Sequence, residues 1–176
     1  VEHLESVADD TIARMAALGV TTSMQPVHCD PAVLDNWQAV LGDERAHTGF
    51  PWHKFRDAGV ALALGTDAPT APHEAPNNLF IAVTAKSVLD RERAPYQPHR
   101  VFTPAEAVEA LTLGTAFATR REHEVGRIAS GYRASVVVWT ATPLADAPEA
   151  LLDSASAMTL VDGEVAYSAE HGTMGA

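Results

Sequence analysis

The sequence predicts an α/β protein with a parallel sheet, followed by a smaller region of short β-strands. Helical and strand patterns alternate over residues 1–67, and this β-α-β-α-β rhythm is typical of an α/β layer or barrel. The segment Val60–Leu64 is apolar at every position, as in strands that helices cover on both faces. Beyond Gly126 the pattern changes to short strands. The chain therefore combines a parallel α/β part with a small β module.

The first part of the chain contains strands that alternate with short helices. The helix that begins at Asp9 is amphipathic and ends at Gly19, a residue that commonly closes helices. Asp30 is placed to cap the next helix, and Gly59 closes the one after it. The expected strands are 1–3, 20–24 and 60–64, and the expected helices are 9–18, 31–40 and 52–58.

The second part begins with a long loop after Asp67, A-P-T-A-P-H-E-A-P-N, whose prolines suit neither helix nor sheet. A helix is expected over 78–89. Another begins at T-P-A-E, with Thr103 as N-cap, and continues to about Ala118. The clearest later strand is 134–139. Residues 158–167 read as a hairpin that turns on Asp162-Gly163, a dipeptide that favours a type I′ turn.

Composition excludes several classes of protein. The chain has 176 residues, of which 47% are hydrophobic and 20% charged, so it has enough apolar residues for a folded core. Its net charge of -11 argues against nucleic acid or an anionic membrane as a partner. The single cysteine, Cys29, excludes an internal disulfide framework and indicates a reducing compartment, so we expect a cytoplasmic protein. The first residue is Val1, and we expect the chain to start within a longer polypeptide.

Three polar residues stand where the expected strands end: His3, His28 and Asp67. In a parallel α/β barrel, groups at the carboxyl ends of the strands face one shared active-site mouth. Histidine and aspartate suit zinc or a similar divalent ion, which generates hydroxide near neutral pH. A bland interpretation stays open, because strand-end histidines are often structural and an aspartate after Gly-Thr is often a turn former.

Cys29 follows His28 directly, which raises the possibility of a thiol nucleophile. Such a nucleophile needs a base and a third group that orients the base. The sequence offers no recognisable orienting group. A small buried residue is therefore the preferred interpretation of Cys29.

Four segments in this order resemble a known family: V-E-H-L-E-S-V-A-D-D-T-I-A-R-M-A-A-L-G-V-T-T-S-M-Q-P-V-H, L-A-L-G-T-D-A-P-T-A-P, F-T-P-A-E-A-V-E-A-L-T-L-G-T-A-F-A-T-R-R-E-H-E-V-G-R-I-A-S-G-Y-R-A-S-V-V-V-W and V-D-G-E-V-A-Y. Together they resemble the C-terminal part of a metal-dependent amidohydrolase, in the branch called amidohydrolase family 3, which acts on amide-type C–N bonds. The resemblance extends from His3 to Tyr167.

The resemblance implies a (β/α)8 TIM-type barrel with a divalent metal at its mouth, zinc being favoured, and a β-sandwich built from both chain ends. Residues 1–122 would be the C-terminal part of the barrel, and 123–176 would be part of the sandwich. By the same resemblance, His3 stands at the metal histidine of the sixth strand. Asp67 stands at the eighth-strand aspartate, which binds metal and activates the hydrolytic water. His28 matches a place near the substrate.

The resemblance also implies that this chain is incomplete. The family's remaining metal ligands would lie upstream of Val1, and a (β/α)8 barrel typically takes about 250 residues. The strands present would leave a parallel edge exposed, which calls for the missing N-terminal part or a self-associated copy. Two functions follow as alternatives: a portion of a hydrolase acting on a small amide-type substrate, or a catalytically incomplete fragment with a scaffolding or assembly role.

Overall fold

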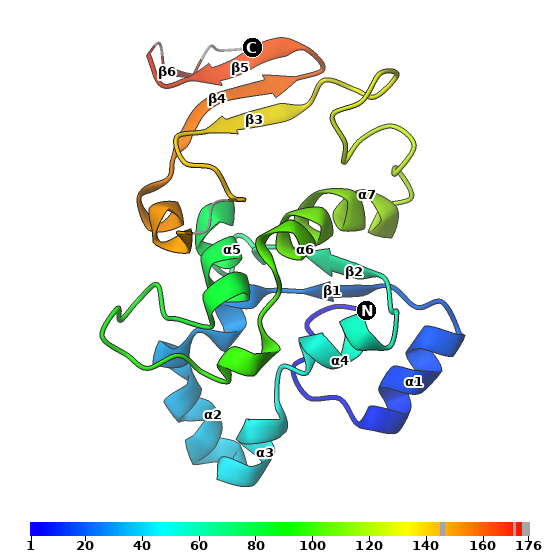
Figure 1. Cartoon of the computed structure of the whole chain (residues 1–176), viewed down its shortest axis with the longest axis vertical. Helices are drawn as coiled ribbons and strands as arrows, with labels where there is room; N and C mark the ends of the chain where they lie inside the picture. The colour runs from blue at the N-terminus through cyan, green and yellow to red at the C-terminus, as the bar shows by residue number, and fades with distance from the viewer. Residues whose placement is uncertain (145–146, 171, 174–176) are drawn as a thin grey trace.

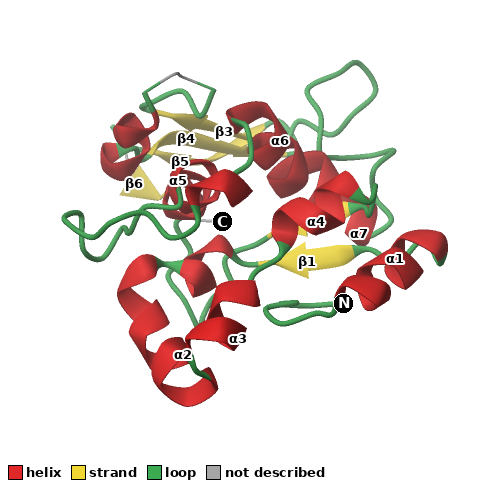
Figure 2. Cartoon of the chain, turned by 60° about the horizontal axis from the view of Figure 1, so that its bottom comes forward, coloured by secondary structure: helices red, strands yellow, loops and turns green. Residues whose placement is uncertain are grey.

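The computed structural model describes residues 1–144, 147–170 and 172–173 and contains two separate sheets (Figure 1). A parallel pair, β1 (Thr22–Met24) and β2 (Leu62–Leu64), lies among the helices. An antiparallel sheet forms a second layer, which lies apart from β1 in Figure 1 and again in Figure 2. The mixed α/β class is thus confirmed. Residues 145–146, 171 and 174–176 of the expected second domain lie outside the described residues.

The parallel sheet has a third, very short member at the start of the chain. Glu2 forms a parallel bridge with Ser23 of β1. The Ser23 amide donates to the Val1 carbonyl, and the Ser23 carbonyl accepts from the His3 amide, both at 2.8 Å. The strand end expected at 1–3 is therefore present as a single bridge. The order along the sheet is residues 1–3, β1 and β2, so three successive segments run in parallel.

The helices of the first part follow the expected rhythm, with two differences. The stretch expected as one helix over 31–40 divides into a 3₁₀ turn and α2, and Asp30 caps that turn by accepting from the Ala32 amide at 2.8 Å. A short helix that was not expected, α3, follows. The bounds in chain order are α1 (Asp9–Ala17), 3₁₀ turns Pro26–Cys29 and Pro31–Val33, α2 (Leu34–Leu41), α3 (Asp43–Thr48), α4 (Trp52–Asp57) and α5 (Ala75–Thr84).

The expectation of a helix over 78–89 was wrong at both ends, because α5 occupies Ala75–Thr84. Ala85 adopts a left-handed conformation with φ 55°, which ends the helix. The residues beyond are held by Asp30, whose carboxylate accepts from the Val88 amide at 2.8 Å and from the Ser87 hydroxyl. A tertiary contact therefore overrides the helical pattern of this stretch.

The helix that begins at the capping box is continuous but changes type along its length. The Thr103 amide donates to the Glu106 carboxylate at 2.7 Å, and the Glu106 amide donates to the Thr103 hydroxyl at 3.2 Å. The expected start is thus confirmed. The helix then runs as α6 (Pro104–Glu109), a π-helical turn (Ala110–Gly114) and α7 (Thr115–Ala118).

This helix covers the outer edge of β2, an edge that was expected to be exposed. The Thr22 amide donates to the Ala61 carbonyl, and the Gly65 amide donates to the Met24 carbonyl. Because alternate residues of a strand direct their backbone groups to opposite sides, the carbonyls of Leu62 and Leu64 point away from β1. The Thr115 hydroxyl donates to the Leu64 carbonyl at 3.1 Å. A Cβ added to Gly114 would lie 2.0 Å from the Leu62 carbonyl oxygen. Glycine therefore permits the close approach that covers this edge.

The core lies between the parallel sheet and its helices. Met24 of β1, Phe55 of α4 and Phe80 of α5 are among its largest fully buried side chains. Leu151, in the 3₁₀ turn Pro148–Asp153, is 2% exposed and joins the same core. The segment that connects two strands of the second sheet is therefore anchored in the first layer. Within the described ranges, no helix has both the length and the apolar character needed to cross a bilayer.

The second layer has the order β3-β4-β5-β6, with all neighbours antiparallel. The expected hairpin is confirmed: Asp162 and Gly163 both have positive φ, 52° and 89°, as a type I′ turn requires. The Arg133 guanidinium holds the turn through the Asp162 carboxylate, with Nε at 2.6 Å from Oδ1. The bounds are β3 (Val136–Trp139), β4 (Ser156–Val161), β5 (Glu164–Ser168) and β6 (Gly172–Thr173).

Replacing Gly114 by alanine is expected to destabilise the chain. Alanine normally favours a helix over glycine by about 1 kcal/mol. Here its methyl group would collide with the Leu62 carbonyl, so we expect a net loss of about 1–3 kcal/mol in the free energy of unfolding. Urea denaturation measures the change, and Gly65→Ala, where the nearest atom to an added Cβ is 4.0 Å away, is the control. A stabilised Gly114→Ala variant would contradict the close contact.

Candidate metal centre

His3, His28 and Asp67 lie together at the carboxyl-end side of the parallel sheet. His3 follows the bridge beside β1, and His28 lies in the 3₁₀ turn Pro26–Cys29 that comes shortly after β1. Asp67 comes soon after β2. Because parallel strands end at the same edge of a sheet, segments far apart in sequence deliver these side chains to one place.

His28 is the centre of this cluster. Its Nδ1 lies 2.8 Å from Glu5 Oε1, and its Nε2 lies 3.3 Å from Asp67 Oδ2. Its ring stacks on that of His3, with centroids 5.4 Å apart and an interplanar angle of 27°. The side chains of His28 and Asp67 are 21% and 29% exposed, so the cluster is partly buried.

His3 is held by an amide. Its Nδ1 lies 2.9 Å from Gln25 Oε1, and Gln25 is only 4% exposed. The Gln25 amide nitrogen in turn donates to the Glu2 carboxylate at 3.2 Å. A partner on one ring nitrogen that leaves the other one free is the usual arrangement around a histidine that binds metal.

The donor set fits a divalent cation. Among the described residues, His3, Glu5 and His28 each offer a ligand atom, and these atoms lie within 4.8 Å of one another. Asp67 lies outside that group and reaches it through His28. Two imidazoles and a carboxylate are a ligand type that zinc accepts. The geometry therefore places His3 and His28 in one donor group with Glu5, while Asp67 meets that group only through its contact with His28.

Sequence reasoning missed Glu5 because its position depends on an unusual turn. His3 and Leu4 are left-handed, with φ of 68° and 55°, and the Leu4 amide donates to the Glu2 carbonyl at 2.9 Å. Asp67 is also left-handed, with φ 59°. Residues other than glycine adopt this conformation rarely and at an energetic cost, and such residues gather at functional sites. The only signal in the sequence was the closeness of Glu5 to His3.

The turn that carries His28 is fixed by two buried side chains. Asn78 of α5, 2% exposed, accepts from the Val27 amide at 3.0 Å. Asp30 is fully buried and accepts from the Ala32 and Val88 amides, both at 2.8 Å. The backbone on both sides of His28 is therefore anchored to other parts of the fold.

Cys29 is set up as a structural residue and not as a nucleophile. Burial, and secondarily the Asp30 carboxylate, raises the pKa of the Cys29 thiol well above its usual range. The thiol therefore stays protonated at neutral pH, whereas a nucleophilic cysteine needs a lowered pKa. Cys29 is partly exposed rather than fully buried, so the interpretation as a small buried residue holds in part.

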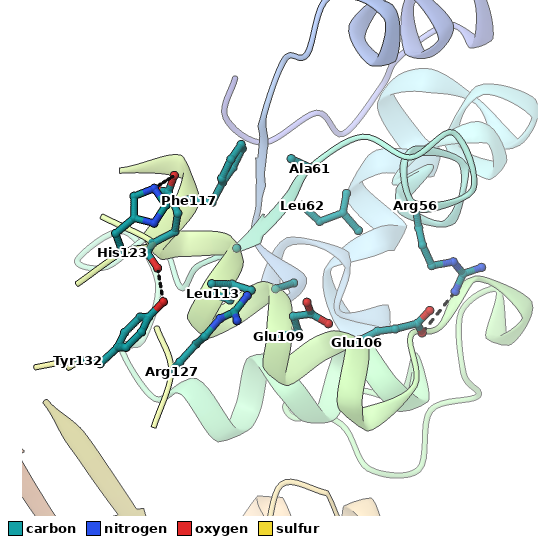
Figure 3. Close-up of a pocket in the computed structure, with 13 residues that line it drawn as sticks. Arg56, Ala61, Leu62, Glu106, Glu109, Leu113, Phe117, His123, Arg127 and Tyr132 are labelled. Carbon is teal, nitrogen blue, oxygen red and sulfur yellow. Dashed lines mark hydrogen bonds and ion pairs between the residues drawn. The ribbon is translucent and has the colours of Figure 1, made fainter. Parts of the chain in front are cut away.

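A separate groove, drawn in Figure 3, is lined by residues near the start of β2 and by none of His3, His28 and Asp67. It has a volume of about 520 Å³. Ala61, Leu62, Leu113 and Phe117 give it an apolar floor, while charged side chains that include Arg56 and Glu106, 3.7 Å apart, surround it. Asp67 follows the other end of β2, so this groove is not part of the candidate metal centre.

Cys29 is expected to react slowly with thiol reagents in the folded chain. Because the raised pKa keeps the thiolate fraction small at neutral pH, iodoacetamide should modify the folded chain far more slowly than the urea-unfolded chain. Mass spectrometry of timed samples measures both rates. Equal rates in the two states would contradict the desolvated thiol.

Curated relatives share this sequence over most of its length. The Bacillus subtilis protein YtcJ, named as a candidate amidohydrolase, is 29% identical over 168 residues, which is 94% of this chain and 31% of that protein. N-substituted formamide deformylase of Arthrobacter pascens is 29% identical over 159 residues, covering 88% of this chain and 28% of that protein. The chain thus spans less than a third of the length of these relatives.

Solved structures share the fold. An uncharacterized metal-dependent hydrolase from Pyrococcus furiosus is 27% identical with a TM-score of 0.65, covering 82% of this chain and 28% of that one. A zinc-bound adenosine deaminase from Xanthomonas campestris has a TM-score of 0.68 over 99% of this chain and 38% of that one, but at 20% identity it shows the fold alone.

The model of the amidohydrolase family matches residues 1–167, which is nearly the whole chain. The match includes all the residues of the histidine cluster and extends into β5. It agrees with the resemblance seen in the four sequence segments. The chain belongs to the amidohydrolase family, in the branch called family 3.

Proposed function

We propose that this chain is the C-terminal portion of a metal-dependent amidohydrolase, which hydrolyses an amide-type C–N bond of a small molecule with a metal-activated water. The observation that carries the proposal is the meeting of His3, His28 and Asp67 at the carboxyl-end side of the parallel sheet. Family membership supports it, as do a relative named as a formamide deformylase and a similar structure named as a metal-dependent hydrolase.

His3 and Asp67 are proposed to hold a divalent cation, with zinc favoured, together with ligands from outside this chain. Such a cation, when bound, makes water a nucleophile near neutral pH and polarises the substrate carbonyl. The Gln25 contact on Nδ1 leaves Nε2 of His3 available for this role. The left-handed turn at Asp67 sets its carboxylate beyond the end of β2, in contact with the cluster.

Asp67 has a second proposed role as general base. Its carboxylate accepts a proton from the attacking water and can pass that proton to the departing amine nitrogen. His28 lies 3.3 Å from Asp67 Oδ2 through Nε2 and is partly exposed, and it is proposed to contact the substrate. The half-buried position suits both roles, because the groups are partly shielded from water and yet accessible.

The wider architecture is proposed on the same basis. Residues 1–122 would be the C-terminal part of a (β/α)8 barrel, and 123–176 would be part of a β-sandwich. The parallel pairing of β1 with β2 and the antiparallel β3–β6 sheet support this division. The missing N-terminal part of the barrel, or a second copy of this chain, would complete the structure. A cytoplasmic location is proposed from the reduced, single cysteine.

One observation favours the alternative, a catalytically incomplete fragment with a scaffolding or assembly role. The outer edge of β2 is where a neighbouring barrel strand would pair. In this structure Gly114 and Thr115 cover that edge, and the Leu64 carbonyl accepts a hydrogen bond from the Thr115 hydroxyl. The chain thus protects its own sheet edge, as a self-contained fragment would need to do.

The substitution Asp67→Asn is expected to abolish hydrolysis by the full-length protein. Asparagine keeps the volume but loses the charge and the basicity, so a loss of roughly 10²–10⁴-fold or more in kcat is expected while the fold persists. N-substituted formamides and other small amides serve as substrates. Asp57→Asn, at an exposed carboxylate of α4, is the matched control. Unchanged turnover in Asp67→Asn would exclude the assigned role.

Metal content distinguishes the two functions. If this chain supplies only part of the metal site, the 176-residue chain alone should lose zinc on dialysis. A metal that is held by only a few protein ligands is bound weakly. The full-length protein should keep zinc in stoichiometric amount. Elemental analysis with intact mass measures both. A full-length protein without bound metal, inactive on every amide tested, would favour the scaffolding role.

A further inference from the structure

We propose that a small cavity beside the end of α5 binds one water molecule, which accepts from the Trp52 indole N–H and donates to the Gln97 side-chain oxygen. The residues that line the cavity include neither His3 nor His28 nor Asp67. The site is therefore separate from the candidate metal centre, and the proposal does not depend on the proposed function.

Two buried polar atoms at this place have no hydrogen-bond partner in the described part of the chain. These atoms are Nε1 of Trp52 and Oε1 of Gln97. Trp52 is only 5% exposed and Gln97 only 7%. A buried polar group that stays unpaired is costly, and the N–H of a buried tryptophan usually has a partner. We therefore expect both atoms to meet a partner that is not part of the chain.

The two atoms have opposite polarity, which identifies the kind of ligand. The indole N–H only donates, and an amide oxygen only accepts. The Gln97 amide is oriented by its Nε2, which donates to the His47 carbonyl at 2.9 Å, because the reverse orientation would place two acceptors against each other. A cation would suit only the oxygen and an anion only the N–H. One water molecule accepts from the first atom and donates to the second.

The cavity has space for a water molecule and little more. Trp52 and Gln97 both line it, and its volume is about 20 Å³. A buried water needs roughly 10–15 Å³, whereas sites for small organic ligands typically have about 300–1,000 Å³. The size therefore favours water over a substrate or a cofactor.

Two other polar side chains on the cavity wall, Tyr96 and Arg100, already donate elsewhere. The Tyr96 hydroxyl donates to the Ala46 carbonyl at 2.7 Å, and the Arg100 guanidinium donates to the His47 carbonyl at 2.8 Å. The Tyr96 oxygen keeps a lone pair that can accept a third hydrogen bond from the water. About three hydrogen bonds are usual for a buried water.

The water connects two parts of the fold that follow irregular backbone. Trp52 begins α4 two residues after Phe50, and both Phe50 and Gln97 are left-handed, with φ of 50° and 52°. Among the described residues, no hydrogen bond joins the Trp52 indole to the Gln97 amide directly. The water is thus the link that satisfies both side chains where the start of α4 meets the segment 96–101.

A rotating-frame Overhauser spectrum of the 176-residue chain tests the proposal, because it detects water held near the Trp52 indole proton. The chain has three tryptophans, so Trp52→Phe identifies the Trp52 signal by its loss. In the wild type we expect a cross-peak at the water frequency with the sign opposite to the diagonal, which marks close contact with held water. Exchange of the proton with bulk water would give the same sign as the diagonal.

Variants show which groups hold the water. Gln97→Met keeps a side chain of similar length without the accepting oxygen, so most of the cross-peak intensity should be lost. Gln38→Met, the same change at an exposed position of α2, should leave the cross-peak unchanged. Tyr96→Phe should keep it, which excludes a signal relayed through an exchanging hydroxyl proton.

Three results would overturn the proposal. A wild-type chain with no water cross-peak at this proton, or with one of the exchange sign, excludes held water even if the variants fail to fold. A folded Gln97→Met variant with the full cross-peak excludes Gln97 as the acceptor. Loss of the cross-peak in folded Tyr96→Phe assigns the signal to the hydroxyl. The measurement involves neither metal nor substrate, so its outcome is independent of the tests of the proposed function.

Discussion

The parallel pairing of β1 with β2 is the constraint on which the rest of the structure depends. Two backbone hydrogen bonds of 2.9 Å, from the Thr22 amide to Ala61 and from the Gly65 amide to Met24, fix the register of the two strands. Because the strands run in the same direction, the segments after them emerge on the same side. His28 and Asp67 meet for this reason, and a slip in register would separate them.

Around that pair, the molecule uses buried polar side chains to hold irregular backbone in place. Asp30 receives donors from its own turn and from the segment after α5, while Asn78 binds the turn from the helix side. A buried carboxylate is costly unless it is fully hydrogen-bonded, and Asp30 meets that condition through several donors. The site is therefore built on loops, but these loops are anchored as firmly as regular elements.

Local chemistry made much of this fold predictable from sequence. The capping box at Thr103 and the Asp162-Gly163 turn each depend on neighbouring residues, and each was found where expected. The end of α5 and the position of Glu5 depend on contacts distant in sequence, with Asp30 and with His28, and these were missed. The roles of the site residues stay predictions, because the geometry shows proximity and not chemistry.

The covered edge of β2 links the two proposed functions through one energetic comparison. In a closed barrel, the Leu64 carbonyl would accept from a neighbouring strand, whereas here it accepts from Thr115. Exchanging one hydrogen bond for another changes the free energy little, since each is worth about 1 kcal/mol net. Burial of the apolar groove floor, which includes Leu62 and Phe117, would then decide the balance. The hydrogen-bond exchange alone therefore favours neither a self-contained fragment nor a chain that pairs with the rest of a barrel.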